Sequence, residues 1–231
     1  MDLKLLHLGC GQVVGRHWTN IDSSLNVILD NHRWLARILR PILPSSSKTQ
    51  KFVGVQRIEL RAAWPYASQS FDAIFSSHFL EHLSLSDAKH VLKECFRVLK
   101  PGGQIRFIVP CLEAEIAEYL REKNAGTALA ATRFGERTCI FPEYSGAWWY
   151  RLYCRFYDKN SHKMLYDYTS LEHYFNEAGF ENAKRSNFLD SSIPHLDEVE
   201  LKDRYERATC IEARKPRVAG SLPQPKLAAA G

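Results

Sequence analysis

The sequence near the N-terminus combines a short apolar run with two glycines separated by one residue. Residues 3–8 have the apolar character of a buried strand, and Gly9, Cys10 and Gly11 follow directly. Glycine has no Cβ, so a Gly-x-Gly turn after a strand lets backbone N–H groups approach a ligand closely. A second short strand then ends at Asp22. Nucleotide-binding folds place there the carboxylate that accepts hydrogen bonds from ribose hydroxyls, so the spacing points to such a fold.

The glycine pattern by itself leaves an alternative open. The dinucleotide-binding fingerprint has a third glycine, and its acidic residue lies about 20 residues further on. Here Val13 stands where the third glycine is often found, and the interval between Gly11 and Asp22 leaves little room for a full crossover helix. A plain strand followed by a tight turn therefore remains an alternative interpretation of this segment.

The composition favours one globular domain. Hydrophobic residues make up 45% of the 231 residues and charged residues 25%, which is ordinary for a soluble protein. No apolar run approaches the roughly 20 residues that span a bilayer, so we expect no stable membrane insertion. The net charge of +5 is too small and dispersed to indicate a nucleic-acid partner. Six cysteines without Cys-x-x-Cys spacing predict free thiols in a reducing cytoplasm.

Hydrophobic periodicity after Asp22 predicts alternating helices and strands. A strand at Phe71–His78, a helix from Ser84 to Leu99 and a strand at Gln104–Val109 predict a right-handed parallel crossover. His78 then lies at the carboxyl end of a strand, where open α/β sheets place catalytic groups. Further helices are expected within residues 33–44, at 112–121 and at the capping-box pattern of Thr169 and Glu172. Further strands are expected within 52–60, 180–188 and 209–214, the last two as an antiparallel edge.

The stretch from about residue 130 to 160 loses its periodicity and becomes rich in aromatic residues. Such a long connection is typical of a lid or a binding loop, in which aromatic rings stack on a sugar or a ring-shaped substrate. A satellite core beneath the insertion explains the same residues equally well. Residues 216–231 have the composition of a flexible tail. We therefore predict a single domain over residues 1–215.

Several short motifs occur in an order that resembles the class I S-adenosylmethionine-dependent methyltransferases. The motifs are Leu-His-Leu-Gly-Cys-Gly (6–11), Asn-Ile-Asp (20–22), Trp-Pro-Tyr followed by Ser-Phe-Asp-Ala-Ile (64–74), Leu-Glu-His-Leu (80–83) and Arg-Val-Leu-Lys-Pro-Gly-Gly (97–103). Weaker matches continue to Cys-Ile-Glu-Ala-Arg-Lys (210–215), so the resemblance covers about residues 3 to 215. The longer pattern is similar to small bacterial predicted methyltransferases of the type-11 kind.

The resemblance implies a Rossmann-like, seven-stranded and mostly parallel sheet with helices on both faces, and S-adenosyl-L-methionine as the cofactor. The cofactor-binding residues that it implies are Gly9, Cys10, Gly11, Asp22, Glu59, Leu60, Ser76 and Ser77. The glycine loop would pass beneath the methionine part, Asp22 would bind the ribose diol, and Glu59 and Leu60 would meet the adenine. One departure is His7, which stands where the family has an acidic residue.

Methyl transfer from a sulfonium needs an acceptor held in line and, for a hydroxyl or amine acceptor, a base. His78 is the candidate catalytic base, because an unperturbed imidazole titrates near neutrality. Its alternative role is to shape the pocket. The expected reaction is O-methylation of a small molecule or a glycan. The oligomeric state stays open, and the alternatives are a catalytically degenerate scaffold with the same fold and, more distantly, an NAD-binding reductase.

Other polar residues are interpreted more conservatively. Glu81 and His82 are neighbours at a helix start, and such neighbours rarely converge on one ion, so we predict no metal site. Residues His162, Tyr166 and Asp167 suit a hydrogen-bonded loop anchor slightly better than a group that closes over the substrate. The acidic residues Asp190, Glu198 and Glu200 are expected to be solvated, without a role in the site.

Overall fold

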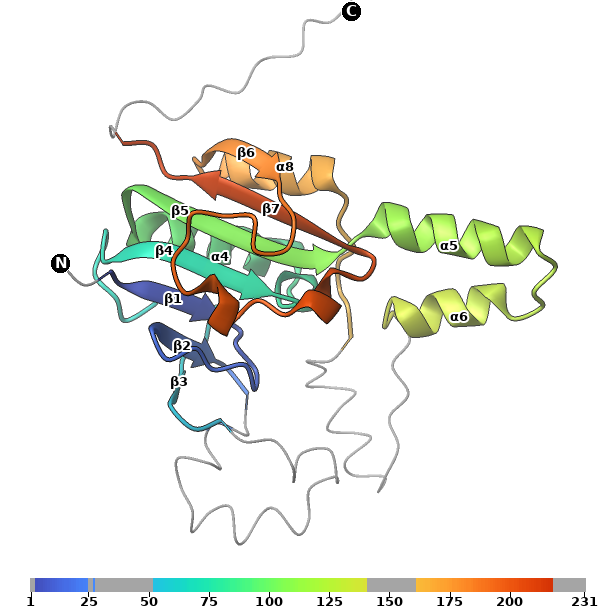
Figure 1. Cartoon of the computed structure of the whole chain (residues 1–231), viewed down its shortest axis with the longest axis horizontal. Coiled ribbons are helices and arrows are strands. Elements are labelled where there is room, and N and C mark those ends of the chain that lie inside the picture. The colour runs from blue at the N-terminus through green and yellow to red at the C-terminus, as the bar shows by residue number, and fades with distance from the viewer. Residues whose placement is uncertain (1–2, 25–26, 28–51, 141–160, 218–231) are drawn as a thin grey trace, which may run out of the picture.

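The computed structural model describes residues 3–24, 27, 52–140 and 161–217 (Figure 1). Its strands are β1 (Leu5–Leu8), β2 (Trp18–Asp22), β3 (Val55–Arg57), β4 (Phe71–Ser77), β5 (Leu99–Pro110), β6 (Glu181–Arg185) and β7 (Ala208–Arg214). Its α-helices are α4 (Leu85–Val98), α5 (Leu112–Asn124), α6 (Ala130–Arg137) and α8 (Tyr168–Glu177). Short 3-10 helices are η1 (Leu80–His82), η2 (Leu196–Glu198) and η3 (Lys202–Tyr205).

The strands form one seven-stranded sheet in the order β3-β2-β1-β4-β5-β7-β6. Pairing is parallel from β3 to β5, and β7 runs antiparallel to both β5 and β6. This confirms the predicted α/β sheet and its antiparallel C-terminal edge. Strand β7 lies between β5 and β6, and β6 is the edge strand. Leu8 of β1 pairs with Ser76 of β4. The loops that follow these two parallel strands therefore emerge at the same edge of the sheet.

The two faces of the sheet are covered by different kinds of structure. On one face, α4 and α8 pack their apolar sides against strand residues such as Leu6 and Ile74 (Figure 1). On the other face, Leu5 and Phe75 pack against Ile193, Leu196 and Val199. In the described part of the chain, this second face is covered by the segment 186–207 and its 3-10 helices, and the helix predicted within residues 33–44 lies outside the described ranges. The β1–β2 connection is too short to add a crossover helix.

Local signals set the ends of helix α4. The Ser84 hydroxyl accepts a hydrogen bond from the Asp87 N–H at 3.2 Å, which confirms the predicted N-cap. The helix ends at Val98, and β5 begins immediately at Leu99. The predicted strand is longer than expected because Pro101, Gly102 and Gly103 are part of it.

The capping box predicted at Thr169 and Glu172 is wrong by two residues. Asp167 is the N-cap of α8, and its carboxylate accepts a hydrogen bond from the Ser170 N–H at 2.7 Å. The Ser170 hydroxyl accepts the Asp167 N–H in return, at 3.3 Å. Aspartate is a stronger N-cap than threonine, so the helix begins earlier. Asp167 is therefore a helix anchor, as the conservative interpretation of this residue stated.

A buried arginine fixes the segment 186–207 on the sheet. The Arg106 side chain, on β5, is fully buried, and its Nε donates to Glu200 Oε1 at 2.8 Å. Its Nη1 donates to Glu212 Oε2 at 3.1 Å, and its Nη2 donates to the Tyr205 hydroxyl at 2.6 Å. Glu200 was expected to be solvated, and this expectation is wrong because the carboxylate neutralises a cation inside the protein.

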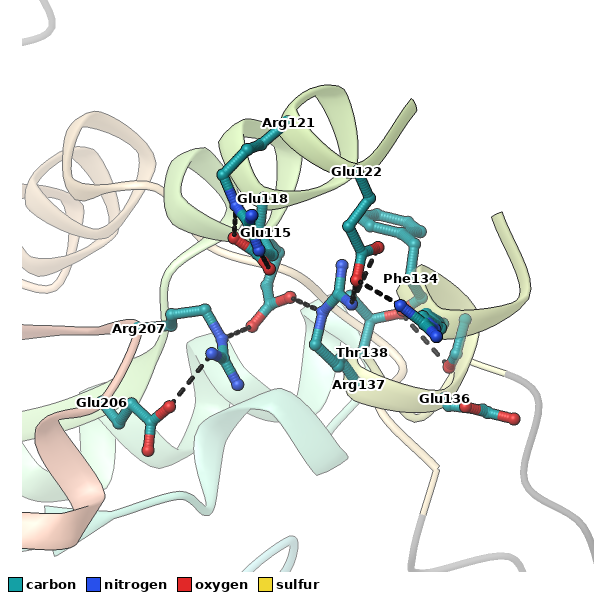
Figure 2. A network of polar contacts seen from close by, with 12 residues as sticks. Glu115, Glu118, Arg121, Glu122, Phe134, Glu136, Arg137, Thr138, Glu206 and Arg207 are labelled. Atoms are coloured by element: carbon teal, nitrogen blue, oxygen red, sulfur yellow. Dashed lines mark hydrogen bonds and ion pairs between the residues drawn. The ribbon is translucent and has the colours of Figure 1, made fainter. Parts of the chain in front are cut away.

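Helices α5 and α6 form a hairpin that projects beyond the sheet (Figure 1). Helix α6 lies at the start of the predicted insertion, where no periodicity was recognised. Figure 2 shows the polar network of this hairpin: Arg137 contacts Glu115 at 2.9 Å and Glu122 at 3.1 Å, and Arg207 contacts Glu115 at 2.9 Å. Charged pairs thus join the two helices to each other and to the start of β7.

Several expectations fall on residues that the structure does not describe. The predicted helix within 33–44 and most of the aromatic insertion, residues 141–160, lie outside the described ranges. The division into a domain over 1–215 and a tail over 216–231 stays a prediction. None of the described helices has the length and apolar character needed to cross a membrane. The five described cysteines are free thiols.

Candidate active site

A cavity of about 380 Å³ lies where the chain leaves β1 and β4. Its walls include Gly9, Cys10 and Gly11 after β1, and Ser77 and His78 at the end of β4. The remaining lining residues are His7, Gln12, Val13, Phe52, Val199, Leu201 and Arg204. The two loops predicted to form the site therefore meet across one cavity. Its volume lies within the roughly 300–1,000 Å³ typical of small-molecule sites.

The glycine loop is held in place by β2. The Gly11 N–H donates to Asp22 Oδ2 at 3.0 Å, and Asp22 Oδ1 accepts the Ser24 N–H at 2.6 Å. Gly9 and Gly11 have φ angles of +58° and +53°, a region that favours glycine. Burial, together with the nearby Asp22, raises the pKa of the Cys10 thiol to about 12. Cys10 is therefore a neutral, packed side chain rather than a nucleophile.

His7 lines the cavity from β1 and is almost fully buried. Its ring lies 5.3 Å from that of Phe75 and 6.2 Å from that of Trp18, measured between centroids. Its Nδ1 has no hydrogen-bond partner among the described residues. Burial lowers the pKa of His7 to about 4, against a hydrogen bond with Asn20 that raises it. At neutral pH this position therefore carries no charge, unlike the acidic residue that the resemblance predicts there.

We expect His7 to make the protein less stable in acid. Its pKa is about 4 in the folded state and about 6.5 when exposed, so below pH 6.5 the unfolded chain binds a proton that the folded chain does not. Stability is therefore lost as the pH falls from 6.5 to 4, by about 3 kcal/mol at 1.4 kcal/mol per pH unit. Urea unfolding of the wild type and of His7→Leu at several pH values measures the difference. An equally steep loss of stability in His7→Leu would contradict this assignment.

The residues at the end of β4 have different surroundings. Ser76 is buried, and its hydroxyl donates to the Leu8 carbonyl at 3.1 Å, so it joins β4 to β1 and does not line the cavity. The Ser77 hydroxyl lies 3.1 Å from His78 Nδ1, and both residues face the cavity. The His78 N–H donates to the Ile108 carbonyl at 2.9 Å. His78 has a φ of +52°, which is uncommon outside glycine and typical of strained functional positions.

The electrostatic surroundings of His78 keep its ring neutral. Burial, followed by the charges of Arg204, His162 and His82, lowers the pKa of His78 to about 4, and Asp203 opposes the fall. The sequence predicts an imidazole with a pKa near neutrality, whereas these surroundings give His78 a lower pKa. A neutral ring can accept a proton at physiological pH, although it is a weaker base than a free histidine.

Four of the residues predicted to bind the cofactor are not among those that line the cavity: Asp22, Glu59, Leu60 and Ser76. Glu59 is half-buried and paired with Arg61, with 2.9 Å between the Arg61 Nε and a Glu59 carboxylate oxygen. Leu60 is buried in the main core, and its carbonyl accepts the Trp64 indole N–H at 3.1 Å. The structure therefore brings the glycine loop and His78 together, but it does not bring the Glu59 carboxylate to them. The cofactor contacts of Glu59 and Leu60 stay predictions.

Sequence reasoning missed the part of the wall that comes from the segment 186–207. Val199, Leu201 and Arg204 line the cavity, and the Arg106 network holds this segment in place. The only signal in the sequence is Arg106 itself, an arginine inside an apolar strand, because a buried arginine needs an acidic partner. The partner's position cannot be read from that signal.

A second polar group lies beside His78 but outside the cavity walls. Glu81 is buried, and burial raises the pKa of its carboxyl to about 8. His162 Nε2 lies 4.0 Å from Glu81 Oε1, and the rings of His82 and His162 are 4.9 Å apart in an edge-on arrangement. Tyr166 is buried next to this group, and its carbonyl accepts the Leu112 N–H at 2.9 Å. Tyr166 thus anchors its segment to the start of α5.

Residues 6–107, from β1 into β5, match the family model described as a methyltransferase domain, of type 11. The matched range contains the glycine loop, Asp22 and His78, and it ends before the segment 186–207. Among curated proteins, the sequence has no match.

Solved structures resemble this chain at low sequence identity. A methyltransferase from Methanosarcina mazei is 15% identical, with 94% of each chain covered and a TM-score of 0.49. One from Archaeoglobus fulgidus is 15% identical, with 92% of this chain and 86% of that chain covered and a TM-score of 0.48. Both are described as dependent on S-adenosylmethionine. At this level of similarity they carry no argument about the acceptor.

Proposed function

We propose that this chain, a member of the class I S-adenosylmethionine-dependent methyltransferases, methylates an oxygen atom of a small molecule or a glycan. The observation that carries the proposal is the pairing of two features across one cavity. The glycine loop Gly9–Gly11 lines the cavity from the end of β1, and the neutral imidazole of His78 lines it from the end of β4. One wall suits a cofactor that must approach the backbone, and the other offers a base for the acceptor.

The residues around the glycine loop fit S-adenosylmethionine. A Cβ on Gly9 would lie 2.7 Å from the Phe79 ring, so no larger residue fits there. A Cβ on Gly11 would meet no atom within 4 Å, which leaves open space beside the loop. Each Asp22 oxygen accepts one backbone N–H and keeps a second lone pair for a ribose hydroxyl. In this proposal the Gly9–Gly11 backbone and Asp22 hold the cofactor.

The proposed roles of the other predicted contacts follow from their positions. Ser77 orients the His78 ring through the 3.1 Å contact, and Ser76 fixes β4 against β1. Glu59 and Leu60 follow β3 at the same edge of the sheet, where their backbone is proposed to meet the adenine ring. Each of these assignments is a proposal about binding, to be tested by cofactor affinity.

The proposed reaction requires only two things of the chain's own residues, to position the acceptor and to accept a proton. Bound S-adenosylmethionine supplies an electrophilic methyl group on a sulfonium. The chain's own residues hold the acceptor in line, and His78 accepts the proton that leaves the acceptor hydroxyl as its oxygen forms the new bond to carbon. Arg204, which also faces the cavity, favours an acceptor that carries negative charge.

An inactive scaffold is an alternative that makes a different demand on this region. A scaffold that retains the fold without activity predicts a blocked pocket, whereas the glycine loop and His78 line an open cavity. We also propose that the protein is cytoplasmic and binds no nucleic acid, as its composition predicts.

The acceptor test is a screen of hydroxyl-bearing small molecules and glycans with a methyl-labelled cofactor. Label transfer only to amines, or to no acceptor in the presence of bound cofactor, would contradict O-methylation.

We expect Asp22→Ala to weaken binding of S-adenosylhomocysteine by about 10- to 100-fold, which corresponds to about 1–3 kcal/mol. The substitution removes the proposed ribose contact and also releases the Gly11 N–H, so the loop is less well ordered before binding. Calorimetry measures the change. Asp72→Ala is the matched control, because Asp72 pairs with Lys100 at the opposite end of β4. Equal affinities of the two variants would show that Asp22 does not bind the cofactor.

A further inference from the structure

Three side chains near the end of β4 form a group with the composition of a metal site. The ligand atoms of Glu81, His82 and His162 all lie within 4.8 Å of one another. Glu81 and His82 belong to η1, directly after β4, and His162 belongs to a segment far along the chain. Sequence spacing does not group these three residues, because Glu81 and His82 are neighbours and His162 joins them only in the fold.

The Glu81 carboxylate lacks a partner that would explain its burial. Its exposed surface is 1%, and neither oxygen accepts a hydrogen bond from another described residue. Among the described residues, the nearest positively chargeable atom is His162 Nε2, at 4.0 Å, which is beyond hydrogen-bond distance. Burying an ionised carboxylate is strongly unfavourable unless a cation or several hydrogen bonds compensate it, so without a cation this carboxyl group keeps its proton. A bound cation would supply that compensation.

The backbone holds the three residues in a fixed arrangement. The N–H groups of Lys163 and Met164 donate to the Glu81 carbonyl, at 2.8 and 3.1 Å, and thereby fasten the His162 segment to η1. His82 Nδ1 lies 3.2 Å from the Ser161 carbonyl. Histidines that bind metals typically donate one ring N–H to a carbonyl and coordinate through the other nitrogen. The Ser161 contact orients His82 in this way, with Nε2 as the ligand.

We propose that Glu81, His82 and His162 bind one divalent cation of the zinc class, with an open coordination position. Two imidazoles and one carboxylate suit Zn²⁺, Co²⁺ or Mn²⁺, whereas Ca²⁺ and Mg²⁺ prefer all-oxygen sites. Bonds of about 2.0 Å in tetrahedral geometry place ligand atoms about 3.3 Å apart. The 4.0 Å between His162 Nε2 and Glu81 Oε1 therefore requires only a small contraction.

The position of this site connects it to the proposed reaction. His82 and His162 lie close enough to His78 for their charges to act on its ring. A cation held by them adds positive charge beside the proposed base, where it favours the ionised form of an acceptor hydroxyl. This second step rests on the proposed function, whereas binding of the cation does not.

The test titrates Zn²⁺ into the full-length protein after removal of metals with a chelator. The titration uses His195→Asn as the background variant. A second group of potential ligands lies on the surface, formed by His17, His195 and Glu198, and this substitution deprives it of one ligand. In that surface group two of the ligand atoms already contact each other, since His17 Nδ1 lies 2.5 Å from Glu198 Oε1. We expect the His195→Asn protein to bind one equivalent of Zn²⁺ by calorimetry. We expect Glu81→Gln and His162→Gln, each in this background, to weaken binding at least 100-fold.

Co²⁺ gives an independent measurement, because a bound ion in a four- or five-coordinate site produces visible absorption bands. The bands should form in His195→Asn and be lost in Glu81→Gln, with circular dichroism confirming that the variant is folded. Zn²⁺ binding that disappears with His195→Asn and persists in Glu81→Gln would overturn the proposal. Methyl transfer without any Zn²⁺ binding would also overturn it while leaving the proposed function intact. A bound ion without methyl transfer would support the metal site and contradict the proposed function.

Discussion

His78→Asn is expected to lower kcat by about 10²- to 10⁴-fold, the usual contribution of a general base. Asparagine tolerates the left-handed backbone at this position, where φ is +52°, so the substitution removes the imidazole without straining the turn. The backbone hydrogen bond from residue 78 to the Ile108 carbonyl is also kept. Affinity for S-adenosylhomocysteine should therefore change little, and the loss should be confined to turnover.

The matched control is His195→Asn, which replaces another histidine with a left-handed backbone, at a φ of +55°. His195 is exposed and does not line the cavity, so its replacement should leave turnover unchanged. The pH profile adds a second readout. Because burial and nearby positive charges lower the pKa of His78 to about 4, its base form predominates above that pH, and the wild-type rate should fall only as the pH approaches 4 from above. Full turnover in His78→Asn would exclude a base role.

The second large effect is expected on stability. Arg106→Met should lower the free energy of unfolding by about 3–5 kcal/mol, because it leaves the buried Glu200 carboxylate without its cation and Glu212 with only the exposed Lys184, at 3.7 Å. The same substitution should loosen the segment 186–207. Since Val199, Leu201 and Arg204 of that segment line the cavity, binding of S-adenosylhomocysteine should weaken as well.

Urea unfolding gives the comparison. Arg61→Met is the control, since Arg61 forms an exposed pair with Glu59, with side chains 44% and 38% exposed. Such a pair contributes about 0–1 kcal/mol. A loss of stability in Arg106→Met no larger than in Arg61→Met would mean that apolar packing, rather than the charge network, holds the segment on the sheet.

Most of the central sheet could be predicted because its signals are local. The apolar run of β1 ends in glycines, Ser84 caps α4, and the apolar positions of α4 recur at helical spacing. The motif order that resembles methyltransferases agrees with the family match over residues 6–107. The error at α8 was also local: two capping patterns overlap there, and Asp167 with Ser170 forms the actual box.

What could not be predicted depends on contacts between distant residues. Nothing local to Glu200 indicates that it is buried against Arg106, 94 residues away. The same holds for His162 beside Glu81, and for Leu201 and Arg204 at the cavity. The charge state of His78 is a further case, because its pKa depends on burial and on charges from other segments.

Calorimetry of S-adenosylhomocysteine with a glycine variant tests the central claim most directly. Gly11→Asn places a side chain in the open space beside the loop, at a φ of +53° that asparagine tolerates. Gly126→Asn is the matched control, because Gly126 has a φ of +76° and equally open surroundings, but lies just after α5, away from the cavity. We predict that the wild type and Gly126→Asn bind with equal affinity and that Gly11→Asn does not bind. Equal binding by Gly11→Asn, or no binding by the wild type, would contradict a cofactor site at this loop.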